Sequence, residues 1–166
     1  MTAAPTWRLR DAETPLRLFL AFFLLTITAG YAIGILFVDH TSSGTPQGLA
    51  EQFRGSGDSA AGAELRYEKS SDEMSIFLHN HILSLSLIFF AVGGIFHFSS
   101  IASGTLKSFL MIEPFAAIVT TFGGIWLMRY VSPAFSYLVM LSGVTMGLCF
   151  VAMVSLILVE LSSPRP

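Results

Sequence analysis

Long apolar stretches separated by short polar segments dominate this chain and predict four membrane-spanning helices. About 20 apolar residues, rising about 1.5 Å each, cross the roughly 30 Å hydrocarbon core of a bilayer. We expect spans at residues 16–38, 74–98, 105–130 and 134–160. The sequence therefore predicts an all-α fold, an integral membrane up-down bundle of four transmembrane helices, with residues 1–166 forming a single domain.

The connections between the spans set the order of the helices. Only a few residues separate the second, third and fourth spans, so these helices are expected to be antiparallel neighbours. The one sizeable polar segment, residues 39–70, contains a short helical pattern that opens at Thr45 and ends at Gly55. Ser70 and Glu73 form a capping-box pattern at the start of the second span.

Basic residues before the first span indicate the orientation of the chain. Arg8, Arg10 and Arg17 lie there, and basic residues near the ends of spans are retained on the cytoplasmic side. The apolar run 18–38 is too long for a cleaved signal peptide and lacks an Ala-x-Ala exit, so we expect a retained anchor. We predict a multi-pass protein of the bacterial inner (cytoplasmic) membrane, with cytoplasmic N- and C-termini and a periplasmic loop at 39–70.

Composition excludes several classes of function. The chain is 53% hydrophobic and 12% charged, with a mean hydropathy of +0.69, which is typical of a protein surrounded by lipid. A net charge of -2 offers no basic face for nucleic acid. Cys149 is the single cysteine, so a disulfide framework, a CxxC metal motif and a CxxCH site for covalent haem c are all excluded. No nucleophile–base set is present either, so we do not expect an enzyme acting on its own.

Three of the four histidines lie in the second span. At 100° per residue His79 and His97 share one helical face and lie about 27 Å apart along the axis, whereas His81 points the other way. Histidines at two depths could serve as axial ligands of haem b, of a metal ion or of a chlorophyll-type pigment. His79 and His81 point about 160° apart and cannot share one metal ion. His40, at the end of the first span, lies at a similar depth and could form a metal site with either His79 or His81. The alternative is that they are interfacial polar residues in contact with water.

Haem ligation by two histidines within one chain would need partner histidines on another span. The first, third and fourth spans contain none. A homodimer, another subunit or a different axial ligand would have to supply the second ligand.

Two further places carry ionisable groups. Glu113 is the deepest carboxylate, about two turns into the third span, and Pro114 beside it is expected to bend the helix. Such a carboxylate could transfer protons or hold a quinone head-group, or it could be protonated or paired and simply fix helix packing. Arg129 and Tyr130, at the far end of the same span, are expected to extend toward the lipid headgroups.

Small residues recur at helical spacing in the first and fourth spans. Gly30 with Gly34, and Gly143 with Gly147, each form a GxxxG pattern, which lets a second helix approach closely. We predict that these faces pack against neighbouring helices. The expected partners of the chain are thus the lipid bilayer and other membrane-protein subunits or a second copy.

Three stretches resemble a family of small four-span bacterial inner-membrane proteins. They are PLRLFLAFFLLTITAGYAIG in the first span, HNHILSLSLIFFAVGGIF in the second and SPAFSYLVMLSGVTMG entering the fourth. Some of these proteins carry a covalent haem c motif in the loop after the first span, which the cysteine-free loop of this chain lacks. The resemblance implies a place beside a respiratory or photosynthetic electron-transfer complex, with any redox group held non-covalently.

Three functions follow from these observations. The first is a small inner-membrane subunit associated with an electron-transfer complex, with histidines of the second span as haem or metal ligands. The second is a cofactor-free accessory subunit that packs against a larger membrane complex. The third is a small transporter or proton pathway through Glu113.

Overall fold

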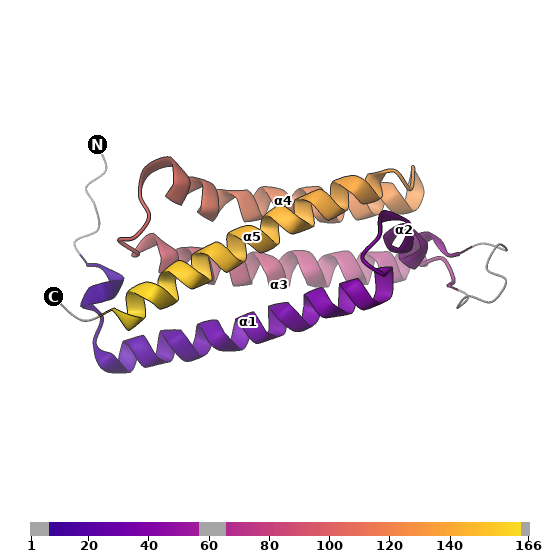
Figure 1. Ribbon diagram of the computed structural model, residues 1–166. Coiled ribbons are helices and arrows are strands. Elements are labelled where there is room, and N and C mark those ends of the chain that lie inside the picture. Colours follow the sequence, from indigo (N-terminus) through magenta and orange to yellow (C-terminus); the bar gives the residue numbers. More distant parts are fainter. Residues whose placement is uncertain (1–6, 57–65, 164–166) are drawn as a thin grey trace.

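A computed structural model describes residues 7–56 and 66–163 of the chain, which are helical with short connections. Four of the helices are long and apolar enough to cross a membrane. The prediction of an all-α four-helix transmembrane bundle is confirmed, and the chain is an integral multi-pass membrane protein. The elements in chain order are η1 (Leu9–Asp11), α1 (Thr14–Ser42), α2 (Pro46–Arg54), α3 (Ser71–His97), α4 (Gly104–Tyr130) and α5 (Phe135–Ser162) (Figure 1).

Local sequence determines where the short helix and the second span begin. Thr45 caps α2, because its hydroxyl oxygen accepts a hydrogen bond from the Gly48 amide at 3.0 Å. Glu73 and Ser70 form the reciprocal capping box at the start of α3, with N···O distances of 2.8 and 3.3 Å. Both helix starts were predicted from the sequence, as was the end of α2 at Gly55.

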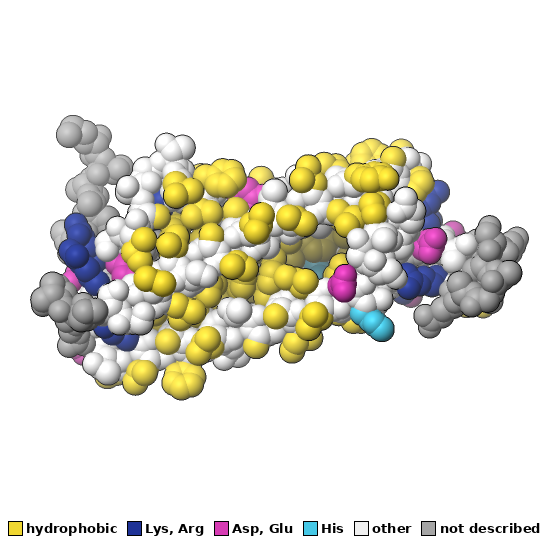
Figure 2. Space-filling model, in the orientation of Figure 1, with side chains coloured by type: hydrophobic (Ala, Val, Ile, Leu, Met, Phe, Trp, Pro, Cys, Tyr) yellow, Lys and Arg dark blue, Asp and Glu magenta, His cyan; other side chains and the backbone are white. Residues whose placement is uncertain are grey.

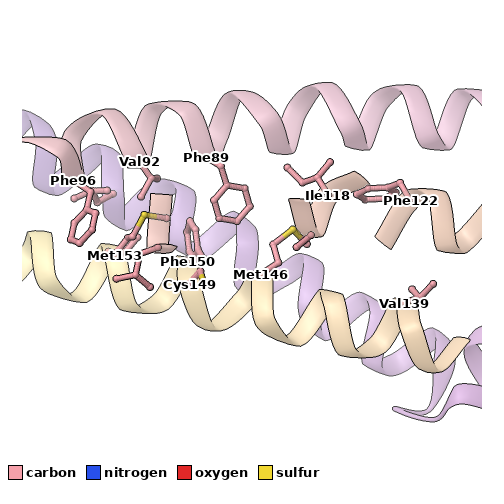
Figure 3. Close-up of a cluster of buried hydrophobic side chains, with 14 of the residues drawn as sticks. Phe89, Val92, Phe96, Ile118, Phe122, Val139, Met146, Cys149, Phe150 and Met153 are labelled. Atoms are coloured by element: carbon pink, nitrogen blue, oxygen red, sulfur yellow. The ribbon is translucent and has the colours of Figure 1, made fainter. Parts of the chain in front are cut away.

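The hydrophobic core lies between α3, α4 and α5 (Figure 3). In the most apolar 18-residue window of each helix, 44% of the residues are buried in α4 and in α5, against 17% in α3 and 6% in α1. A Cβ added at Gly124 of α4 would lie 2.9 Å from Val139 Cγ2 of α5, so these two helices are closely apposed. The hydroxyls of Thr121 and Ser142 are 2.8 Å apart in the same interface. Such a bond between membrane helices contributes about 0.6 kcal/mol on average.

Helix α1 contacts the bundle through only part of its length. Tyr31 stacks on Phe150 of α5, with ring centroids 4.2 Å apart. Beyond it, the nine consecutive residues 32–40 are all exposed. Nine residues make more than two helical turns and therefore point in every direction around the axis. This half of α1 has separated from the other helices, and the chain rejoins them at α2.

Polar contacts fasten one end of the bundle, which we call the termini end because α1 begins and α5 ends there. Arg17 Nη1 donates to the Ser163 carbonyl oxygen at 2.9 Å, joining the first turn of α1 to the end of α5. The Leu9 amide donates to the Phe98 carbonyl oxygen at 3.1 Å, which joins η1 to the end of α3.

The opposite end, which we call the α2 end, is fastened by a different arginine. Arg54 of α2 donates through Nη1 to the carbonyl oxygens of Met128 and Arg129 at 2.9 and 3.0 Å. A cation is favourable there because the carbonyls of the last helical turn carry partial negative charge. Figure 2 shows Lys and Arg side chains gathered at the two ends and hydrophobic side chains along the length between them.

Candidate functional site

A recess lies between α1 and the other long helices in the half of the molecule nearest the α2 end. Figure 2 shows it as a hollow between α5 and α1, with hydrophobic side chains and a histidine on its floor. Contact of Tyr31 with Phe150 closes it toward the termini end, and α2 lies across its other end. We call this hollow the α1 recess. It exists because residues 32–40 of α1 do not pack against the bundle.

His81 is the histidine that α3 turns toward the other helices. Its ring centroid lies 4.1 Å from that of Phe77 and 5.6 Å from that of Phe122, a buried residue of α4. A side chain in that position would normally be covered, yet His81 is exposed. The separation of α1 explains the exposure, and it gives an imidazole on the inner side of the bundle an open approach.

One hydrogen bond fixes the orientation of the His81 ring. Nδ1 lies 2.9 Å from the Phe77 carbonyl oxygen, one helical turn earlier. Because a carbonyl can only accept, Nδ1 carries the proton, and in the neutral ring Nε2 keeps its lone pair. Histidines that ligate metals usually donate their other ring N–H to a backbone carbonyl or carboxylate in this way. The arrangement is therefore suited to ligation through Nε2.

The other three histidines have different surroundings from His81. His79 and His97 are exposed, and the ring of His97 contacts that of Phe98 at the end of α3. His40 is exposed near the end of α1. Within residues 7–56 and 66–163, no three His, Cys, Asp or Glu side chains gather where they could hold a metal ion. His40, His79 and His81 therefore do not meet at one three-ligand centre in this chain.

Glu113 lies where α1, α4 and α5 meet. Its carboxylate neighbours the Cys149 thiol of α5 and the Tyr31 hydroxyl of α1. Its Oε2 atom is buried and has no hydrogen-bond partner among the described residues. An unsatisfied polar oxygen at this depth is costly, which makes Glu113 a candidate for a functional role. The predicted role of Glu113 in proton transfer or quinone binding stays a prediction.

The carboxylate that the structure buries most completely among the described residues is Glu160, which the sequence analysis passed over. Glu160 is 3% exposed and accepts hydrogen bonds from the Ser99 hydroxyl at 2.5 Å and the Ser100 hydroxyl at 2.7 Å. The Ser100 amide donates to it as well, at 2.9 Å. The only sequence signal was an acid near the end of the last span and a serine pair in a distant turn. Its role is to hold the α3–α4 connection against α5.

The prediction that Arg129 extends toward the headgroups is wrong. Its side chain is 14% exposed, Nε donates to the Lys69 carbonyl oxygen at 2.9 Å, and Nη2 lies 3.3 Å from Glu68 Oε2. These contacts fasten the segment before α3 to the end of α4. Glu68 and the Lys69 carbonyl, from the segment before α3, accept the hydrogen bonds of the guanidinium, so lipid headgroups are not needed for this.

The glycines of the GxxxG patterns differ in what lies beside them. Among the described residues, a Cβ added at Gly30, Gly34 or Gly143 would meet nothing within 4 Å. At Gly147 of α5 the nearest atom would be the hydroxyl oxygen of Tyr31 of α1, 3.7 Å away. The predicted packing role of Gly30, Gly34 and Gly143 against a neighbouring helix stays a prediction.

A family model described as a transmembrane helical domain, Aq_1264_TM, matches residues 43–166, a segment that contains α2 to α5 and begins directly after the end of α1. No match is found among curated proteins or among solved structures.

Proposed function

The chain belongs to the Aq_1264_TM family of transmembrane helical domains. We propose that it is a small subunit of a membrane electron-transfer complex that holds a haem-type group through His81. The observation that supports the proposal is the orientation and exposure of the His81 ring. Its Nδ1 is held by the Phe77 carbonyl, and the residue is exposed although it faces the other helices.

The residues around His81 fit a flat apolar ligand. Phe77 and Phe122 flank the imidazole, and Phe53 of α2 contacts Phe77 with ring centroids 5.3 Å apart. These rings would exclude water and restrict the orientation of a tetrapyrrole, and His81 would provide its axial ligand. A haem bound there supplies one-electron transfer. A second ligand would come from another subunit or a second copy, since no other predicted span of the chain contains a histidine.

The location of the protein is part of the same proposal. The arginines at the start of the chain, Arg8, Arg10 and Arg17, support a cytoplasmic termini end in a bacterial inner membrane. The α2 end, with the α1 recess beside it, would then be nearer the periplasmic surface, on the side where electron carriers of the periplasm dock.

An absorption spectrum of the purified full chain tests the proposal. We expect a Soret band, with sharpened α and β bands after reduction by dithionite. His81→Ala should remove at least nine-tenths of the bound haem. The reason is that losing a ligand that contributes about 1.4 kcal/mol or more weakens the affinity for haem on the order of tenfold. His79→Ala and His97→Ala serve as matched controls, because both histidines are exposed and outside the recess, and they should keep the spectrum.

Two outcomes would contradict this proposal. One is a folded preparation, helical by circular dichroism, that stays colourless after haem is added. The other is loss of the spectrum in His79→Ala to the same extent as in His81→Ala, because the ligand would then lie outside the recess.

A second candidate function is a cofactor-free accessory subunit, favoured by the open surface of α1. Only 6% of its most apolar window is buried, and nothing approaches Gly30 or Gly34. A transmembrane helix of a partner protein would pack there. We expect Gly30→Leu to abolish co-purification of a stoichiometric membrane partner, whereas Val151→Leu, on an exposed face of α5, should not. Intact assemblies in Gly30→Leu would leave this candidate without support.

A further inference from the structure

A second hollow, separate from the α1 recess, lies at the termini end. It is a groove of about 440 Å³ between the first turns of α1 and the last turns of α5. Leu18 and Ala21 form one wall, Leu158 and Val159 form the other, and Arg17 lies in the same lining. The volume is within the range of about 300–1,000 Å³ that is usual for small-molecule sites. Its lining combines an apolar surface with one fixed positive charge.

Within the part of the chain that the structure describes, no carboxylate pairs with Arg17. Its two terminal nitrogens donate to the carbonyl oxygens of Ser163 and Arg10, both at 2.9 Å. The two ion pairs found among the described residues involve neither Arg17 nor Arg10. The Nε atoms of both arginines are buried and have no hydrogen-bond partner there. Among the described residues Arg17 is thus held by carbonyl oxygens and not by an anion.

The nearest acidic side chain on α5 is already engaged. Glu160 directs its carboxylate to Ser99 and Ser100 and forms no ion pair with Arg17. Since no carboxylate of the described residues is paired with Arg17, an anion from outside the chain can bind there. Guanidinium groups are well suited to phosphate oxygens, because several N–H donors point in one plane.

We propose that this groove binds one anionic phospholipid of the surrounding membrane, with its phosphate at Arg17 and an acyl chain along the α1–α5 wall. Depth supports this assignment. Arg17 is the last charged residue before the apolar part of α1, which places it at headgroup level, and Leu18 next to it is 55% exposed. A phospholipid matches this arrangement, because its phosphate lies at headgroup level and its acyl chain extends from there into the apolar part of the membrane. Free phosphate would use Arg17 but leave the apolar wall in contact with lipid.

The test measures lipid binding by the full chain in detergent, by native mass spectrometry, with phosphatidylglycerol and phosphatidylcholine of identical acyl chains. We expect phosphatidylglycerol to bind about fivefold more tightly, which corresponds to roughly 1 kcal/mol for one arginine near an anionic surface. Arg17→Gln should remove this preference. Ala21→Leu, which fills the groove and leaves the arginine in place, should weaken binding of both lipids.

Arg8→Gln is the matched control, since Arg8 is exposed at the same end, outside the groove, and loses the same charge. If Arg17→Gln does not fold because it lacks the hydrogen bond to Ser163, the test relies on the weaker lipid binding expected for Ala21→Leu. Equal binding of the two lipids would overturn the proposal. An equal loss of the phosphatidylglycerol preference in Arg8→Gln and Arg17→Gln would also overturn it, because the lipid would then be attracted by the general positive charge of this end. A third contrary result is complete displacement of the lipid by glycerol phosphate, which would indicate a phosphate site that does not bind a lipid.

Discussion

At the scale of single residues, Gly48 is the position where the backbone leaves no room for a side chain. A Cβ built on Gly48 would lie 2.0 Å from the Ser42 carbonyl oxygen and 2.7 Å from the Ser42 carbonyl carbon. Both are backbone atoms, so the turn between α1 and α2 would have to shift. We expect Gly48→Ala to lower the free energy of unfolding by about 1–3 kcal/mol, as overpacking commonly does, measured by thermal or denaturant unfolding in detergent.

Gly30→Ala is the control for that change. It is the same substitution in a helix of the same protein, but nothing lies within 4 Å of the added methyl group. Alanine favours the helix over glycine by about 0.5–1 kcal/mol, so this variant should be as stable as the parent chain or slightly more stable. Equal destabilisation by both substitutions would show that the α1–α2 turn is not as tight as the structure has it.

The histidines show how far sequence reasoning reaches at this scale. Helical geometry alone predicted that His81 points away from His79 and His97. It could not tell which of the two faces is turned toward the other helices, because that depends on contacts with Phe122 of α4. The bond from Nδ1 to the Phe77 carbonyl is local, one turn away, and could have been anticipated. Glu160 could not, since its serine partners lie about 60 residues earlier.

At the scale of elements, the helices could be predicted, but their packing could not. Apolar length is a local property, and capping residues mark helix starts, so the four spans and α2 were accessible from the sequence. In a lipid environment both the buried face and the lipid-facing face of a helix are apolar. The pattern of apolar residues therefore contains little information about which side of a helix packs. For the same reason it does not reveal that residues 32–40 of α1 lie apart from the other helices.

Small-residue patterns are limited for the same reason. A GxxxG pattern permits close approach but does not show which helix approaches. Between two membrane-spanning helices of this chain, Gly124 of α4 comes close to Val139 of α5 without belonging to such a pattern, whereas nothing lies within 4 Å of a Cβ added at Gly30 or Gly34. The packing role of the GxxxG glycines stays a prediction. The family match covers α2 to α5 and none of α1, so the element that packs least is also the one outside the matched domain.

At the scale of the whole molecule, the basic residues at the two ends bear on the expected orientation in the membrane. At the α2 end Arg54 binds carbonyls at the end of α4, Arg129 pairs with Glu68, and Lys69 lies 3.5 Å from Glu73. At the termini end Arg17 likewise donates to carbonyl oxygens. Retention on the cytoplasmic side depends on where a basic residue lies relative to a span and not on its partners. Because Arg8, Arg10 and Arg17 lie before or in the first turn of α1, we expect the termini end to be cytoplasmic.

Single-cysteine labelling tests this orientation. In a Cys149→Ala background, a membrane-impermeant maleimide applied to spheroplasts should label Tyr67→Cys, at the α2 end, where the side chain is 84% exposed. Ser103→Cys, exposed in the α3–α4 connection at the termini end, should react only after the inner membrane is broken. The Cys149→Ala chain alone is the unlabelled control. The reverse pattern would invert the orientation and move the α1 recess toward the cytoplasm. Labelling of both positions from one side would contradict the passage of α3 across the bilayer, on which the bundle and both proposed sites depend.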